Sequence, residues 1–189
     1  MRIFLAGASG VLGIRLIPLM VAQGYSVVAL TRSQGKVEKL RTLGAQPILC
    51  DVFDRNALIA AVQEARPDVL MHQVTDLPDD AQRLPEFRAL NQRVRSEGTA
   101  NLLAAARAAH HPTFIAQSVA WPIPGTEAHE HAVLAYGGTV LRYGQFYGPG
   151  TYYEKERPPL PRIHIDEAAR QTMQHLSPSS GIITISETE

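Results

Sequence analysis

The sequence predicts an α/β protein in which helices cover both faces of a doubly wound, mainly parallel sheet of six or seven strands. Two observations predict this fold. Short apolar runs alternate along the chain with longer segments whose apolar residues recur at the helical period. In addition, the first apolar run, residues 1–6, passes through Gly7, Gly10 and Gly13 into a helical segment, and a second apolar run follows at residues 26–32. This order, with glycines in the first turn, is typical of a Rossmann-type dinucleotide-binding domain.

The glycine turn offers a place for an anion at the start of the first helix. We expect Gly7 to allow a sharp exit from the strand, Gly10 to let backbone N–H groups approach a pyrophosphate, and Gly13 to let the helix pack on the strand. The first N–H groups of a helix lack partners, and the helix dipole is positive there. The alternative is a tight turn that only connects two elements. The residues expected to contact the cofactor here are Gly7, Ser9, Gly10, Val11, Leu12 and Gly13.

Composition and charge restrict the classes to which the protein can belong. The 189 residues are 45% apolar, as in an ordinary globular domain, and we expect one domain over residues 1–189. The 18 basic and 18 acidic residues balance and are dispersed, so we expect no nucleic-acid or membrane partner. Cys50 is the only cysteine, and no apolar run suits a membrane span or a secretory signal. We therefore expect a cytoplasmic protein.

The end of the second strand bears on the choice of cofactor. NAD-preferring Rossmann domains place an acidic residue there, which binds the ribose hydroxyls. This sequence has Thr31 and Arg32 instead, with Lys36 one helical turn further on. Because guanidinium and ammonium groups can hold a 2′-phosphate, we expect NADP(H) to be preferred over NAD(H). The alternative is a solvated helix start.

The remaining apolar runs complete the predicted sheet. Asp54 is the expected N-cap of one helix, and the pattern of Leu90, Val94 and Gly98 predicts that a long helix packs on the sheet. His72 is expected to be a packed strand residue, and Gln73 begins a polar loop that would border the cofactor at the carboxyl edge. The predicted elements after residue 32 are helices at 34–43, 55–65 and 84–110 and strands at 46–50, 68–72, 113–118, 138–142 and 181–185.

Several segments resemble the extended short-chain dehydrogenases/reductases, in particular the NAD-dependent epimerase/dehydratase family. Besides the glycine spacing, the segments 91–106, 141–150 and 162–169 carry the resemblance. It implies an oxidoreductase that transfers a hydride at a secondary alcohol carbon of a small molecule, such as a nucleotide sugar, with a homodimer as an open alternative. It also implies that Asp51 accepts a hydrogen bond from the adenine amino group and that Val52 covers the ring. The alternative for Asp51 is a turn aspartate.

The same resemblance suggests where chemistry would occur. It places a small hydroxyl, here Ser118, near the reacting carbon, although a structural strand-end serine is the alternative; Gln145 stands where an Asn is usual and is a candidate substrate residue. Catalytic relatives also carry a Tyr and, four residues later, a Lys, whose ammonium lowers the phenol pKa. This pair is absent, since Val140 follows Tyr136 at that spacing. Tyr147 is the next candidate acid or base. A noncatalytic NADP-binding sensor is the alternative function.

Two segments are shorter than the resemblance predicts. Residues 119–136 leave too little chain for the loop and five-turn helix that the family uses there, and we expect a solvated loop around His129, Glu130 and His131. We expect no metal site at these residues, because no Cys or Asp cluster accompanies them. Residues 151–161 are also short. Either the protein is a shortened, noncatalytic relative or the sequence omits segments of a longer chain, and we favour the second, because the flanking motifs are intact.

Overall fold

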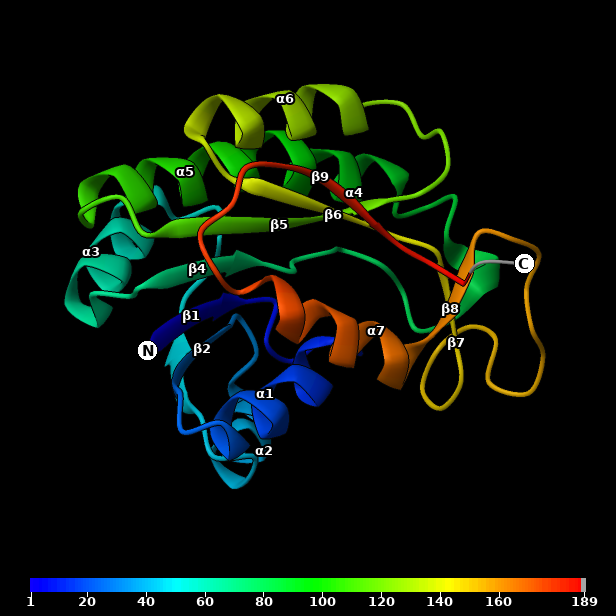
Figure 1. Cartoon of the computed structure of the whole chain (residues 1–189), viewed down its shortest axis with the longest axis horizontal. Coiled ribbons are helices and arrows are strands. Elements are labelled where there is room, and N and C mark those ends of the chain that lie inside the picture. Colours follow the sequence, from blue (N-terminus) through cyan, green and yellow to red (C-terminus); the bar gives the residue numbers. More distant parts are fainter. Residues whose placement is uncertain (188–189) are drawn as a thin grey trace.

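The computed structural model describes residues 1–187 and confirms the predicted α/β fold (Figure 1). The main sheet consists of β1 (Arg2–Ala6), β2 (Ser26–Thr31), β3 (Gln46–Leu49), β4 (Val69–His72), β5 (Thr113–Val119), β6 (Thr139–Tyr143) and β9 (Gly181–Ile185). These seven strands are all parallel and lie in the order β3-β2-β1-β4-β5-β6-β9. The strand order reverses between β1 and β4, and ligands of such sheets bind at that point, outside the carboxyl ends of the strands.

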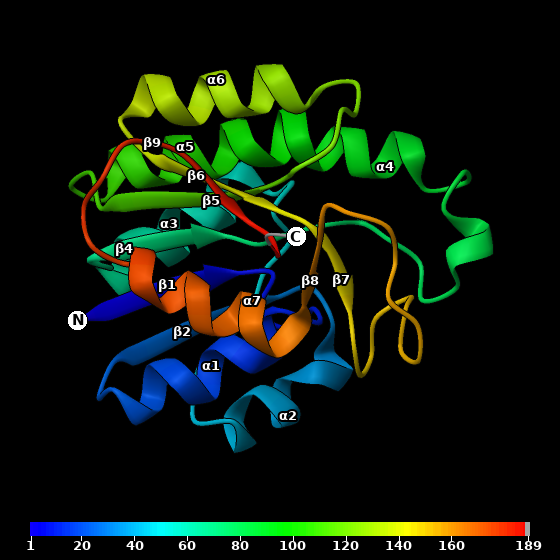
Figure 2. The same cartoon turned by 45° about the vertical axis from the view of Figure 1, so that its right-hand side comes forward.

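Helices cover both faces of this sheet (Figures 1 and 2). One face packs against α1 (Gly13–Ala22), α2 (Val37–Thr42) and α7 (Ile165–Thr172). The other packs against α3 (Arg55–Ala65), α5 (Thr99–Ala108) and α6 (Thr126–Tyr136). Successive strand residues serve opposite faces: Ile3 and Leu5 lie in the first core, whereas Phe4 and Ala6 lie in the second. Burial on both faces explains why the strands read as continuous apolar runs.

The long helix predicted at residues 84–110 is divided. It begins with α4 (Arg88–Arg93), passes through a π-helical turn, η3 (Val94–Gly98), and continues as α5. Leu90 is 43% exposed, so the prediction that it packs on the sheet is wrong, whereas Val94 is 2% exposed. A π-helical turn adds a residue to the local repeat, which rotates α4 relative to α5 and takes Leu90 off the buried face. The short 3₁₀ elements are η1 (Gln34–Lys36), η2 (Ala81–Arg83) and η4 (Met173–His175).

The segment after β5 is a helix, which corrects the predicted solvated loop. The 11 residues of α6 make about three turns rather than five, so the segment is long enough. His129 and Glu130 are each 4% exposed and face inward, while His131 is exposed. Within residues 1–187, no group of three or more His, Cys, Asp or Glu side chains is placed to hold a metal ion.

A second, two-stranded parallel sheet was not predicted. It pairs β7 (Gln145–Tyr147) with β8 (Arg162–His164) and lies beyond the carboxyl edge of the main sheet (Figure 2). Strands of three residues leave no apolar run in the sequence, which is why they were missed. In the part of the chain that the structure describes, no helix is long and apolar enough to cross a membrane.

Candidate functional site

The glycine turn lies at the carboxyl edge of the sheet, where the strand order reverses. Gly7 has a φ of +87°, and a Cβ at this position would overlap the backbone of Gln73. A Cβ at Gly13 would lie 2.5 Å from the carbonyl oxygen of Gly7, closer than such atoms approach in proteins. Only glycine therefore fits at either position, which gives Gly7 and Gly13 the backbone roles that their spacing predicts.

The start of α1 presents unpaired backbone donors. The N–H of Gly10 donates to the Gly7 carbonyl at 3.1 Å, and the N–H of Ile14 donates to the Gly10 carbonyl at 3.1 Å. Between them, the N–H groups of residues 11–13 donate no hydrogen bond to any residue of the described chain, 1–187. Three such donors at the positive end of a helix dipole fit an anionic group such as a pyrophosphate.

The side chain of Gln73 is a second unpaired group at this edge. Its backbone N–H donates to the Ala6 carbonyl at 2.8 Å, which fixes the residue directly after β4. Gln73 is 5% exposed, and neither its amide oxygen nor its amide nitrogen makes a hydrogen bond of ordinary geometry within residues 1–187, although its side chain is close enough to the buried Tyr143 hydroxyl to act on the pKa of that group. Leaving a buried polar group unpaired costs about 1–3 kcal/mol, so a bound ligand with polar groups would remove this cost. The glycine turn, with its unpaired N–H groups at residues 11–13, and the Gln73 amide together fit a dinucleotide.

The end of β2 adds the residues predicted to contact the ribose. The hydroxyl oxygens of Ser9 and Thr31 lie 3.3 Å apart, which links the glycine turn to β2. Arg32 follows β2, and its two terminal nitrogens donate to the carboxylate of Asp76 at 3.0 and 2.9 Å. This hydrogen bond, opposed by desolvation, raises the pKa of Arg32. Lys36 is exposed in η1. The contact with Asp76 was not predicted, because nothing in a polar loop indicates which residue reaches Arg32.

Of the residues that follow β3, Asp51 and Asp54 form hydrogen bonds in a turn and a helix cap, and Val52 packs in the core. Asp51 accepts the N–H of Phe53 at 3.0 Å through one carboxylate oxygen, as a turn aspartate does, and its second oxygen has no hydrogen bond within residues 1–187. Asp54 caps α3, as predicted, by accepting the N–H of residue 57 at 3.0 Å. Val52 is 6% exposed and packs beside Gly98. One oxygen of Asp51 is thus available to a ligand.

Ser118 belongs to a buried charged cluster beneath α6. Its hydroxyl donates to Glu130 at 2.6 Å, and Arg142 donates to the same carboxylate at 2.9 Å. Burial alone would raise the pKa of Glu130, but the hydrogen bonds from Arg142 and Ser118 outweigh it and hold that pKa below its ordinary value. The hydroxyl predicted near the reacting carbon is thus directed toward α6.

Two buried histidines form a hydrogen-bonded chain with Thr99. His129 Nε2 faces the carbonyl of Gln117 at 2.9 Å and must therefore be the donor, which leaves its Nδ1 to accept the Thr99 hydroxyl at 2.8 Å. His72 Nδ1 accepts the N–H of Val74 at 3.3 Å, and its Nε2 donates to Thr99 at 3.1 Å. Both rings are neutral in this arrangement, and burial lowers the pKa of both. The prediction that His72 is a packed strand residue is confirmed, since it is 1% exposed.

Tyr147 and Gln145 lie on β7, which pairs with β8 in the small two-stranded sheet. The Tyr147 hydroxyl donates to Glu187, whose carboxylate also accepts Arg162 Nε at 2.9 Å. This hydrogen bond and burial raise the pKa of Tyr147. The Gln145 side-chain amide donates to the Pro159 carbonyl at 3.3 Å. Both candidate residues therefore hold contacts within the small sheet and its loop.

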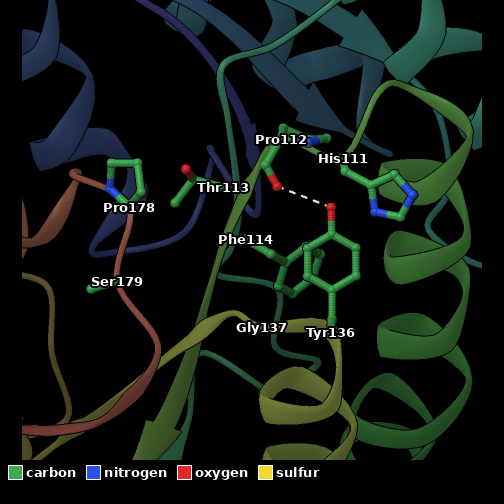
Figure 3. Close-up of a pocket in the computed structure, with 8 residues that line it drawn as sticks. All are labelled: His111, Pro112, Thr113, Phe114, Tyr136, Gly137, Pro178 and Ser179. Atoms are coloured by element: carbon green, nitrogen blue, oxygen red, sulfur yellow. Dashed lines mark hydrogen bonds between the residues drawn. The ribbon is translucent and has the colours of Figure 1, made fainter.

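A cavity of about 250 Å³ lies at the opposite, amino edge of the sheet (Figure 3). Thr113 and Phe114 at the start of β5 and Gly137 before β6 contribute to its wall. The Tyr136 hydroxyl donates to the Pro112 carbonyl at 2.9 Å, which joins the end of α6 to this wall. Because the cavity lies at the amino ends of the strands, it is separate from the glycine turn.

The sequence matches known proteins along its whole length. The family model described as "NAD dependent epimerase/dehydratase family" matches residues 3–134. A Streptomyces protein named 3-diazoavenalumate denitrifying reductase is 32% identical, and the alignment covers 100% of this chain and 77% of the relative. A ketoreductase of Stigmatella aurantiaca is 41% identical over 110 residues, which cover 57% of this chain and 30% of the relative.

Solved structures share the fold. A UDP-glucose 4-epimerase of Thermus thermophilus in complex with NAD superposes with a TM-score of 0.78 at 20% identity, covering 100% of this chain and 78% of that chain. The alignment with the Streptomyces reductase spans 237 positions against the 189 residues here, so at least 48 positions of that alignment fall in gaps of this chain. The chain is therefore shorter than this relative within the aligned region.

Proposed function

Because the chain belongs to the NAD-dependent epimerase/dehydratase family, we propose that residues 1–189 form a single dinucleotide-binding oxidoreductase domain. The observation that carries the proposal is the pairing, at one edge of the sheet, of three unpaired N–H groups at the start of α1 with the unpaired, buried amide of Gln73. Nicotinamide dinucleotide supplies or accepts a hydride when bound. The role of this chain is to bind it, orient it and exclude water from its reacting end.

NADP(H) is the preferred cofactor in this proposal. Thr31, rather than an acid, ends β2, and the Arg32 guanidinium beyond it is 58% exposed on its side chain. Lys36 lies nearby in η1 and is exposed. Two cations beside the ribose position would attract a 2′-phosphate, which has three acceptor oxygens. Asp51 would accept the adenine amino group through its unpaired oxygen.

The substrate is a small molecule that reacts at a secondary alcohol or carbonyl carbon. The Streptomyces relative is named as a reductase and the Stigmatella relative as a ketoreductase, which supports reduction as the reaction type. The nucleotide-sugar epimerases share the fold at 20% identity or thereabouts, and such likeness supports the fold alone. Nucleotide sugars are therefore one of two substrate classes to test, beside ketones.

The chain offers few side chains that could donate or accept the proton in the reaction. Residues 126–136, which form α6, contain no lysine, so no ammonium on this helix can lower a tyrosine pKa. Tyr147 keeps its proton, because its hydrogen bond to Glu187 raises its pKa. A protonated phenol can donate the proton in the reduction of a carbonyl once its hydrogen bond to Glu187 opens, and we assign this role to Tyr147. Ser118 is the second candidate donor, and Gln145 a candidate substrate contact.

A second candidate function is cofactor binding without turnover. The missing Tyr and Lys pair favours it, because the glycine turn is intact while the proton-transfer group is not of the usual kind. Such a module would respond to the NADP(H) pool through binding alone.

An absorbance assay of NADPH with a panel of ketones and nucleotide sugars separates the two functions. Turnover that is lost in Gly10→Val supports the oxidoreductase, and Tyr147→Phe should then lower kcat by about 10²-fold without changing the cofactor Kd. Cofactor binding without turnover on any member of the panel supports the second function. Absence of both binding and turnover in a folded wild-type chain would reject both.

A further inference from the structure

The ion pair of Arg32 and Asp76 lies at the carboxyl edge of the sheet, beside the predicted ribose position of the dinucleotide. Arg32 follows β2 and Asp76 lies four residues beyond β4, and β1 is the strand between β2 and β4. The glycine turn follows β1 at the same edge. A contact between the residues that follow β2 and β4 therefore lies beside this turn, within reach of the 2′ position of a bound adenosine.

The two partners differ in their freedom to move. The Asp76 side chain is 8% exposed, and its backbone N–H donates to Asn91 Oδ1 at 3.3 Å, which fixes the residue against α4. The Arg32 side chain is 58% exposed and has several rotatable bonds. If the pair opens, Arg32 is the partner that moves, and the Asp76 carboxylate stays behind at the edge of the site.

The pair also occupies the donors that a phosphate would need. Both terminal nitrogens of Arg32 donate to Asp76, in the two-pronged geometry that guanidinium groups form with carboxylates and phosphates alike. A 2′-phosphate carries up to two negative charges and three acceptor oxygens, so it can replace a single carboxylate. The neutral 2′-hydroxyl of NAD offers no such replacement.

We propose that Asp76 is a specificity-determining residue that competes with the 2′-phosphate of NADP(H) for Arg32 and so limits the preference for NADP(H) over NAD(H). This inference rests on the proposed function, because it requires that the site binds a dinucleotide. NAD(H) can bind with the pair closed, whereas NADP(H) exchanges Asp76 for its own phosphate. Asp76 thus weakens NADP(H) binding while leaving NAD(H) binding nearly unchanged.

The test is calorimetric titration of wild type and Asp76→Asn with NADP⁺ and NAD⁺. Asn has the same shape and no charge, so NADP⁺ affinity should rise roughly 5-fold and NAD⁺ affinity should stay within about 2-fold. In an Arg32→Ala background the effect of Asp76→Asn on NADP⁺ should disappear, which shows that Asp76 acts through Arg32. The matched control is Glu64→Gln, which removes an exposed carboxylate on α3 and should change neither affinity.

Each other outcome has a distinct meaning. A lower NADP⁺ affinity in Asp76→Asn would overturn the proposal and show that Asp76 orients Arg32 for the phosphate. An equal rise for both cofactors would also overturn it and show that the pair blocks the groove. If wild type binds neither cofactor, the proposed function fails rather than the role of Asp76. Adenosine 2′,5′-bisphosphate and AMP, which differ only by the 2′-phosphate, repeat the comparison on any variant that melts near the wild-type temperature.

Discussion

At the scale of single residues, the proposed preference for NADP(H) depends on Arg32. A hydrogen bond to a charged group contributes about 1.5–3 kcal/mol, so Arg32→Ala should weaken NADP⁺ binding by roughly 10- to 150-fold. NAD⁺ binding should be nearly unaffected, because NAD⁺ has no 2′-phosphate. Calorimetry with both cofactors measures the ratio directly. Arg41→Ala is the matched control, since Arg41 is an exposed arginine on α2 that pairs with Glu38.

An equal loss of affinity for both cofactors in Arg32→Ala would contradict this account. Such a result would mean that Arg32 supports the turn after β2, for example by fixing Asp76, rather than the phosphate. A thermal melt of the variant separates this case from simple unfolding.

Ser118 gives a second prediction at this scale. Its hydroxyl donates to the carboxylate of Glu130 in a buried position, so Ser118→Ala should lower the free energy of unfolding by about 1.5–3 kcal/mol. Urea denaturation at neutral pH measures the change. Ser96→Ala is the control, because the Ser96 hydroxyl is bonded to backbone carbonyls on an exposed helix surface and its loss should cost within about 0.5 kcal/mol. Unchanged stability with lost turnover would instead assign Ser118 to the chemistry.

At the scale of elements, the chain of His72, Thr99 and His129 joins β4, α5 and α6. Both histidines are neutral when folded and have lowered pKa values, so the unfolded chain binds more protons once the pH falls below the ordinary histidine pKa of about 6.5. Stability from this chain is therefore complete above about pH 6.5 and is lost as the pH falls below it. In urea denaturation at several pH values between about 5 and 7, the midpoint urea concentration should fall as the pH is lowered.

A substitution isolates this effect from the carboxylates. His129→Gln should flatten the dependence over the same pH range, whereas His131→Gln, which alters an exposed histidine on the same helix, should leave it unchanged. Glu130, Glu97 and Glu187 have lowered pKa values and titrate below this range. A wild-type midpoint that stays constant between about pH 5 and 7 would show that the buried histidines do not control stability.

The elements that the sequence predicted correctly are those that local physics determines. The central strands β1, β2 and β4 are buried almost throughout and therefore leave continuous apolar runs, whereas the edge strands β3 and β9 are only partly buried. Gly7 and Gly13 follow from backbone geometry alone, since a Cβ would collide with neighbouring backbone at both positions. Asp54 caps α3 within four residues of sequence. Such features need no knowledge of the rest of the fold.

The features that sequence reasoning missed depend on contacts between distant segments. Asp76 and Arg32 are 44 residues apart, and only the path of the loop after β4 brings them together. Glu130 is buried where Ser118 of β5 and Arg142 of β6 donate hydrogen bonds to its carboxylate. This burial was not predicted, because the family resemblance led us to expect a five-turn helix, for which the segment is too short. Leu90 was placed on the wrong face because a π-helical turn has no clear signal in the sequence.

At the scale of the whole molecule, the chain forms a seven-stranded parallel sheet although it is shorter than its Streptomyces relative in the aligned region. All seven strands and the helices on both faces are present, while at least 48 positions of the 237-position alignment fall in gaps of this 189-residue chain. The glycine turn and the seven parallel strands that we propose to hold the cofactor are thus present within residues 1–187. It follows that cofactor binding should persist whether or not the chain turns over a substrate.

The most direct test of the account is a calorimetric titration of the chain with NADPH, with Gly10→Val beside it. A Cβ at Gly10 would lie 3.3 Å from the Gly7 carbonyl, so the variant can fold after a small shift, but its side chain would fill the approach to the N–H groups of residues 11–13. Gly24→Asn is the control, because Gly24 has a positive φ that Asn tolerates and open space around it at the other end of α1. We predict one NADPH per chain for wild type and Gly24→Asn, and no binding for folded Gly10→Val. Equal binding by Gly10→Val and wild type, or no binding by wild type, would contradict the account.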